Sequence, residues 1–331
     1  MGTPPRNTPW DVDSSPRRLP IKAVATELSL PIHEIDTFKG WAPPIFPGGP
    51  INLIVAVSFG LFVPPRILNA AKYGGLNVHP SLLPDLRGPA PLHHVLLAGR
   101  TRTGVTLQTL HLKHFDHGVI LKQTPAPGFE IPHPESCTVP ELLDLVAPKG
   151  AEILMDGIRN GLFVPPVQDA GWRGSEGDEA LIHATKIKPE DRHADWLNWT
   201  WKDISRRHRV LGPLWSRTLA VSNTPTESPI FQQRRVILTE LEEVNSLKGC
   251  EAFSLVPGLP FVDSAQPIDR QQGRGLYVFT RDGKLIRIHQ MKVEGEQNAD
   301  GVRAALKARM LSDRTFQSGS GDFTPFHNPL Q

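Results

Sequence analysis

An amide, an imidazole and a carboxylate occur at positions from which they could act on one substrate. Asn77 and His79 are two residues apart at the end of the segment GLNVH, so in a strand their side chains leave the same face. Asp116 lies in a loop beyond the next strand, within reach of His79. Such a set suits acyl transfer, because the amide donates to an oxyanion, the imidazole polarises the carbonyl and the carboxylate supports the imidazole. The same spacing is also typical of a turn beside a hydrogen-bonded histidine, and the chain has 13 histidines.

These three residues need a sheet to hold them. Apolar segments alternate with helical patterns across the first half of the chain, which predicts an α/β domain with ligands at the carboxyl edge of its strands. The continuous apolar run LIVAV predicts a parallel strand covered on both faces, whereas later strands could run antiparallel. The predicted helices are 21–30, 66–75, 91–99 and 139–158, and the predicted strands are 32–35, 53–57, 75–79, 104–112 and 118–124.

The second half of the chain has a different pattern, which predicts a small β-barrel-like domain. Arg281-Asp282-Gly283 joins two of its strands, and Asp-Gly is a hairpin turn signal. An amphipathic helix follows, with Asp300 as its N-cap and one apolar face formed by Val302, Leu306 and Met310. The predicted strands are 234–244, 251–255, 275–280 and 284–293.

Composition excludes several classes of protein. The only cysteines are Cys137 and Cys250, so one chain can build neither a disulfide framework nor a cysteine-based zinc site, and a reducing compartment is expected. No apolar run approaches the ~20 residues that a membrane helix needs. Residues 1–182 hold 15 Lys and Arg against 17 Asp and Glu, whereas residues 183–331 hold 21 against 17. This asymmetry is compatible with a polyanionic partner for the second half, or with a solvated basic face.

The segment around the three polar residues carries a specific pattern. It has Asn-x-His-x-Ser-Leu-Leu-Pro, then Arg-Gly, Gly-x-Thr and Asp-x-Gly in that order, formed by Asn77, His79, Ser81–Pro84, Arg87-Gly88, Gly104–Thr106 and Asp116–Gly118. This pattern resembles the signature of the 10-formyltetrahydrofolate-dependent formyltransferases and related formyl hydrolases. The resemblance implies a Rossmann-like formyltransferase domain that acts without a metal.

By this resemblance Asn77, His79 and Asp116 take the catalytic positions, and 10-formyltetrahydrofolate is the co-substrate. Ser81 and Arg87 are expected to position the loop rather than to react. The strand end and the Asp116 loop are the implied walls of the folate pocket, although Phe59 and Phe62 would serve equally well in a packed core. The implied cofactor-binding residues are Phe59, Gly60, Leu61, Phe62, Val63, His114, Phe115, His117 and Gly118.

A second resemblance concerns the acceptor. The segment KIKPEDRHADW, with Lys188, Asp191, Asp195 and Trp196, is similar to the linker of the methionyl-tRNA formyltransferases. It implies initiator methionyl-tRNA as a partner and an OB-like tRNA-binding C-terminal domain. The proline-rich stretches resemble a fungal or other organellar version of such enzymes, so a mitochondrial matrix location is expected, together with a monomer without membrane contact. The expected organisation is a disordered segment 1–18, a catalytic domain 19–182, a linker 183–215 and an OB-like domain 216–331. Candidate tRNA contacts are Lys186, Lys188, Arg192, Arg206 and Arg207, although a solvated helix face explains this charge equally well.

The start of the family pattern has no counterpart in this sequence. The family's first strand, the following helix and the second strand would precede residue 21, so the resemblance implies an N-terminally incomplete α/β domain. Two alternatives therefore stay open beside formylation of methionyl-tRNA. One is an inactive remnant that retains RNA binding, and the other is formylation of a different amine, such as that of a sugar nucleotide.

Overall fold

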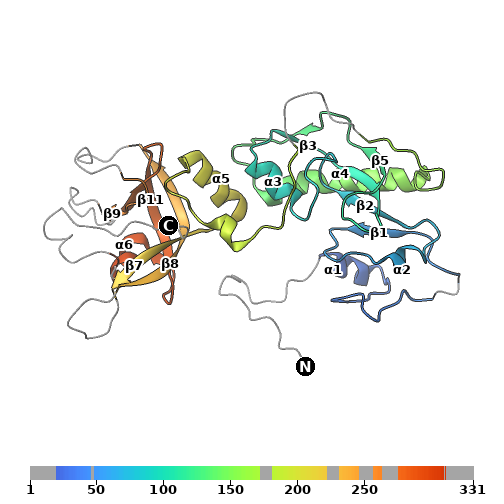
Figure 1. Ribbon diagram of the computed structural model, residues 1–331, viewed down its shortest axis with the longest axis horizontal. Helices are drawn as coiled ribbons and strands as arrows, with labels where there is room; N and C mark the ends of the chain where they lie inside the picture. Colours follow the sequence, from blue (N-terminus) through green and yellow to red (C-terminus); the bar gives the residue numbers. More distant parts are fainter. Residues whose placement is uncertain are drawn as a thin grey trace.

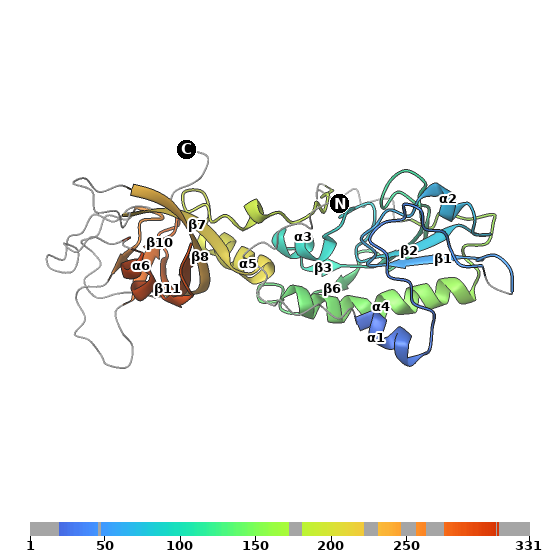
Figure 2. The same cartoon turned by 90° about the horizontal axis from the view of Figure 1, so that it is seen from below.

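The computed structural model describes residues 20–45, 48–171, 181–221, 231–245, 256–262, 275–308 and 310. The expected disordered segment 1–18, the strand expected at 251–255 and Cys250 lie outside these residues. The described part forms two bodies placed end to end, an α/β body and a β-rich body, with a helix between them (Figures 1 and 2). None of the described helices combines the length and apolar character needed to cross a bilayer.

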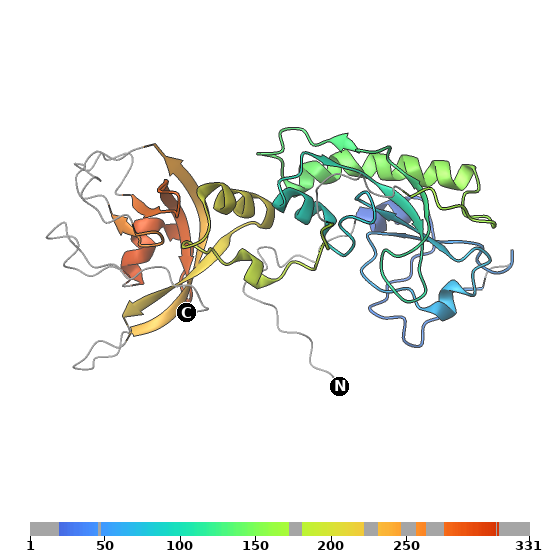
Figure 3. The same cartoon turned by 45° about the horizontal axis from the view of Figure 1, so that its top comes forward.

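The α/β body is built on a four-stranded sheet of order β1-β2-β4-β5. β1 and β2 are parallel, and the other two pairs are antiparallel. The sequence left this arrangement open for the later strands. The long helix α4 begins with a capping box between Thr138 and Glu141 and lies along one face of this sheet (Figure 3). Elements of this body are α1 (Pro20–Glu27), β1 (Ile54–Val57), α2 (Pro65–Leu68), β2 (Gly75–His79), α3 (Pro91–Leu97), β3 (Arg102–Thr103), β4 (Thr106–Thr109), β5 (Ile120–Gln123), β6 (Phe129–Glu130) and α4 (Val139–Arg159).

Three sequence expectations for this body were wrong. The segment 32–35 forms no strand, because no neighbouring segment in the described chain supplies it with backbone partners. β1 is not covered on both faces, since Val55 is 42% and Val57 50% exposed, and it is also an edge strand of the described sheet. The helix expected at 66–75 is only the short α2, followed by turns that close at Gly74, where φ is +64°.

The β-rich body is an antiparallel sheet whose main path is β7-β8-β11-β10-β9. The predicted hairpin between β10 and β11 is confirmed, with Gly283 at φ +73° in its turn. Asp300 caps α6 by accepting from the amides of Val302 and Arg303, but Leu306 is 40% exposed instead of lying on the buried face. The elements are β7 (Leu214–Val221), β8 (Phe231–Val244), β9 (Phe261–Val262), β10 (Leu276–Phe279), β11 (Leu285–Val293), β12 (Ala299–Asp300) and α6 (Gly301–Lys307).

The connection between the bodies is packed against both of them. It contains the 3-10 helix η1 (Pro189–Arg192) and the helix α5 (Trp201–Leu211). Trp196 is buried in the core of the β-rich body, whereas Val210 and Leu211 are buried with the residues of α3 and α4. The segment predicted as a linker therefore belongs to the folded structure.

Candidate active site

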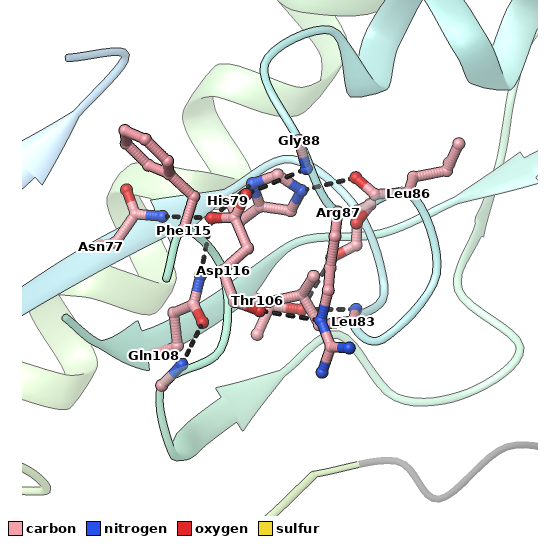
Figure 4. Close-up of polar contacts among 12 residues, drawn as sticks. Asn77, His79, Leu83, Leu86, Arg87, Gly88, Thr106, Gln108, Phe115 and Asp116 are labelled. Atoms are coloured by element: carbon pink, nitrogen blue, oxygen red, sulfur yellow. Dashed lines mark hydrogen bonds and ion pairs between the residues drawn. The ribbon is translucent and has the colours of Figure 1, made fainter. Parts of the chain in front are cut away.

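The end of β2 and the loop after β4 bring the three predicted residues together. Asn77 donates from Nδ2 to Oδ1 of Asp116 over 3.2 Å, and Nδ1 of His79 lies 3.4 Å from the same oxygen (Figure 4). Asp116 reaches this position with φ at +55°, a left-handed conformation that aspartate tolerates better than most residues. The amide, the imidazole and the carboxylate thus form one contact group at the end of a parallel strand.

Two further donors hold the carboxylate of Asp116. The amide of Gly88 donates to Oδ2 over 3.0 Å, and Nε2 of Gln108 donates to Oδ1 over 3.0 Å. Gln108 also accepts from the amide of Gly118 over 3.2 Å, so its side chain ties both ends of the turn that carries Asp116. Sequence reasoning missed Gln108, although it is the cross-strand partner of Asn77. Knowledge of the pairing register between β2 and β4 would have placed Gln108 beside Asn77.

The loop that follows His79 is held from several sides. Ser81 is buried and donates to the carbonyl of Asp85 over 2.7 Å, and Arg87 donates from Nε to the carbonyl of Asp116 over 2.9 Å. The amide of Leu86 donates to the carbonyl of Ile182 over 2.8 Å. Ser81 and Arg87 thus bond to backbone carbonyls of this loop and of Asp116, and their positioning role stays a prediction. The backbone at residue 182 is bonded to the same loop.

The two ring nitrogens of His79 both face acceptors. Nε2 is 2.8 Å from the carbonyl of Leu86, and Nδ1 faces Asp116. Burial lowers the pKa of His79 below its ordinary value, although Asp116 and the Leu86 carbonyl act in the opposite direction. A neutral imidazole has one N–H for these two acceptors, so the other nitrogen can accept a proton. His79 is therefore neutral at rest at neutral pH, and a proton that it gains satisfies both contacts.

Burial of histidines gives the fold a defined pH dependence. The pKa values of His79, His93 and His208 are all lowered, in each case chiefly by burial. Below about pH 6.5 the unfolded chain takes up protons that the folded chain does not, so stability falls as the pH falls from 7 towards 5. Urea midpoints at pH 7.5 and 5.5 measure this loss, and the loss should be smaller in His208→Gln. Equal midpoints at both pH values would contradict the argument.

Gln108 is expected to control turnover through Asp116. Gln108→Met removes both hydrogen bonds at nearly constant size, and should lower turnover about tenfold and stability by about 1–3 kcal/mol. Gln108→Glu places a second carboxyl beside Asp116, so this variant should regain activity as the pH falls and the pair takes up a proton. A pH profile of kcat for both variants measures the effect. Gln123→Met is the matched control, because Gln123 contacts Leu83 and Thr106 instead.

Aromatic side chains occur in the segment after β1 and in the loop that carries Asp116. Phe62 and Phe115 pack edge to face with ring centroids 5.2 Å apart, whereas Phe59 contacts Phe38 at 5.8 Å. Phe115 is exposed by 57% and Phe59 by 44%. An apolar wall therefore stands beside Asp116 between β1 and the loop after β4. The other predicted pocket residues, Gly60, Leu61, Val63, His114, His117 and Gly118, lie in the same two segments.

The predicted tRNA contacts divide into two groups. Lys186, Lys188 and Arg192 are exposed. Arg206 instead donates to the carbonyl of Leu97 over 3.3 Å, and Arg207 lies over the ring of Trp199 at 4.3 Å. Within the described residues no three His, Cys, Asp or Glu side chains are grouped to hold a metal ion.

Comparison with known proteins agrees with the site. The formyl transferase family model matches residues 50–137, which include all three polar residues. The chain is 30% identical over 312 residues to human mitochondrial methionyl-tRNA formyltransferase, covering 92% of this chain and 67% of that protein. A mitochondrial relative from Saccharomyces cerevisiae is 34% identical over 50% of the chain and 44% of its own length. A relative from Geobacillus sp. is 39% identical over 49% of the chain and 47% of its own length.

Solved structures also match. HypX from Aquifex aeolicus in complex with tetrahydrofolic acid has a TM-score of 0.46 at 17% identity, over 83% of this chain and 42% of that chain. The sugar 3N-formyl transferase WlaRD has a TM-score of 0.44 at 14% identity, over 84% and 82% of the two chains. The chain spans between about half and two thirds of the length of the curated relatives that it matches. With two thirds of the human protein covered at 30% identity, the chain belongs to the methionyl-tRNA formyltransferase family.

Proposed function

We propose that this chain transfers a formyl group from 10-formyltetrahydrofolate to the α-amine of methionyl-tRNA. The observation that carries the proposal is the single contact group in which Asp116 meets both Asn77 and His79. Family membership supports the chemistry, since the human and yeast relatives are named for this reaction. The site joins an amide donor, a neutral base and a carboxylate, which acyl transfer to an amine needs.

In this reaction the amine nitrogen attacks the formyl carbon, and the carbonyl electrons move to the oxygen. The second N–H of Asn77 Nδ2, beyond the one given to Asp116, is available to the developing oxyanion. The bond from the formyl carbon to the folate nitrogen then breaks. The amine loses one proton and the leaving nitrogen gains one, so the site must move a proton without consuming it.

His79 and Asp116 are suited to this proton transfer. Burial keeps His79 neutral at rest, so the imidazole can accept a proton when the amine becomes positively charged. The protonated ring would then donate to both Leu86 and Asp116, which stabilises it until the leaving nitrogen takes the proton. A protonated His79 thus belongs to the intermediate rather than to the resting protein.

The folate donor fits the apolar wall beside this group. Phe62 and Phe115 offer ring faces and edges to a pterin, and Asp116 follows Phe115 directly in the chain. A flat aromatic ligand gains from such offset and edge contacts beyond the area it buries. The donor's formyl group would then lie next to Asn77.

Binding of the acceptor tRNA is attributed to the β-rich body. We propose domains at 19–182 and 216–331 joined by 183–215, with the β-rich body as an OB-like tRNA-binding domain. Lys186, Lys188 and Arg192 are exposed basic side chains of the connection that could contact a phosphate backbone. The mitochondrial relatives support action in the mitochondrial matrix, and we propose a monomer.

One assay with three acceptors tests the proposal. The purified chain is incubated with 10-formyltetrahydrofolate and methionyl-tRNA, uncharged tRNA or an amino-sugar nucleotide, and formylated product is measured by mass spectrometry. Of the three acceptors, we expect only methionyl-tRNA to give formylated product, and we expect His79→Ala to form no product. Product with the sugar nucleotide instead would reassign the acceptor. Salt-sensitive tRNA binding without any product would favour an RNA-binding remnant, and turnover that survives in His79→Ala would refute the catalytic assignment.

A further inference from the structure

Three imidazoles gather on the outer side of the loop between β4 and β5. The ring centroids of His111 and His114 are 5.4 Å apart with nearly parallel planes, those of His114 and His117 are 5.5 Å apart, and those of His111 and His117 are 6.5 Å apart. His114 and His117 are exposed and His111 is half-buried. His114 and His117 were predicted to line the folate pocket, but the proton transfer proposed above uses none of the three rings.

Backbone hydrogen bonds orient two of the three rings. Nδ1 of His111 accepts from the amides of Lys113 and His114 over 3.2 and 3.1 Å, so the proton of the neutral ring is on Nε2. Nδ1 of His117 donates to the carbonyl of Phe115 over 2.6 Å, which leaves its Nε2 to other partners. His111 thus keeps an N–H donor at Nε2 whatever its charge. The turn therefore fixes the orientation of two of its imidazoles.

The cluster has no acidic partner in the described part of the chain. No carboxylate there forms an ion pair with any of the three rings. Asp116, the nearest acid in sequence, is directed inward and accepts from Asn77, Gln108 and Gly88. Lys113, in the same turn, adds a cation. Because the described residues also offer no three-ligand metal group, an anion is the better-matched ligand.

We propose that His111, Lys113, His114 and His117 form a subsite for the carboxylates at the glutamyl end of the folate donor. This inference rests on the proposed function. Phe115 packs against Phe62, and in the chain it lies between exposed His114 and Asp116, whose side chain is buried. A donor with its formyl group at Asp116 and its rings at these phenylalanines would place its anionic end beyond them, over the loop. N–H donors and a lysine are suited to carboxylates there.

Donors that differ only in the number of carboxylates test this subsite. Initial rates are compared for 10-formyltetrahydrofolate with a single glutamate and with a chain of γ-linked glutamates. The wild-type KM should be about tenfold lower for the longer donor, and added salt should reduce this preference. A triple variant, His111→Gln with His114→Gln and His117→Gln, should lose the preference for the longer donor while keeping the KM for methionyl-tRNA. His133→Gln removes an exposed imidazole elsewhere and should keep the preference.

Other results would overturn the subsite. These are equal KM values for the two donors in the wild type, or an undiminished preference in the triple variant. If the triple variant has a raised KM for methionyl-tRNA and unchanged KM values for both folate donors, the imidazoles would be assigned to a tRNA phosphate. If the wild type formylates no acceptor, the proposed function fails by itself. Calorimetric binding of the two donors would then still show whether the triple variant loses the preference for the longer one.

Discussion

Asp116→Asn is expected to lower kcat by about 10²- to 10⁴-fold, the range for loss of a positioned acid–base group. The carboxylate accepts from Asn77, Gln108 and Gly88, so every contact that it makes with them needs an acceptor oxygen. An amide supplies one oxygen and one NH₂ group, and the NH₂ group would face donors. We therefore also expect a stability loss of about 1–3 kcal/mol, seen as a lower urea midpoint.

The effect on kcat must exceed what the stability loss alone produces. Rates are therefore measured at a temperature where circular dichroism shows the variant to be folded. Asp144→Asn is the matched control, because Asp144 is exposed on α4 and should leave both quantities unchanged. A folded Asp116→Asn protein with kcat near that of the wild type would remove Asp116 from the mechanism.

Gly118→Ala is expected to be the most damaging single change to the fold of the site. A Cβ at this position would lie 1.7 Å from the carbonyl oxygen of Thr109 and 2.6 Å from its carbonyl carbon. These are backbone atoms of β4, so the conflict cannot be relieved by turning a side chain. We expect destabilisation of about 3 kcal/mol or more, measured by urea unfolding, together with loss of turnover.

Gly48→Ala is the matched control for this change. A Cβ there meets nothing within 4 Å, so the expected change in stability is within about 0.5 kcal/mol. The Gly118 variant also connects the packing of the loop with activity. If the loop moves as a unit, the hydrogen bond from Gly118 to Gln108 is lost and Asp116 moves with it. A Gly118→Ala protein with the stability and turnover of the wild type would contradict the close packing of the loop on β4.

The polar group could be predicted because its signals are local. Asn77 and His79 share a face through the period of a strand, and Asp116 was found through its motif and lies against both. Gln108 was not found, because its role depends on the antiparallel register of β4 against β2. The contact of Leu86 with Ile182 joins residues almost a hundred positions apart, and no local pattern encodes it.

Other misinterpretations have the same physical origin. Apolar composition predicted a strand at 53–57 but not its exposed edge, because the presence of a second neighbour is a property of the sheet. Positive charge at Arg206 indicated a polyanionic partner. In the structure its guanidinium donates to the backbone carbonyl of Leu97. Charge alone does not distinguish a phosphate from a carbonyl oxygen.

The contacts of residues 182–184 place the catalytic loop and the β-rich body mechanically in series. The amide of Leu86 is bonded to Ile182, and the amide of Ala184 donates to the carbonyl of Arg87 over 2.7 Å. The chain then runs directly to η1, α5 and β7. We therefore expect a displacement of the β-rich body to strain the loop backbone that is bonded to His79 and Asp116. A flexible linker would absorb such a displacement.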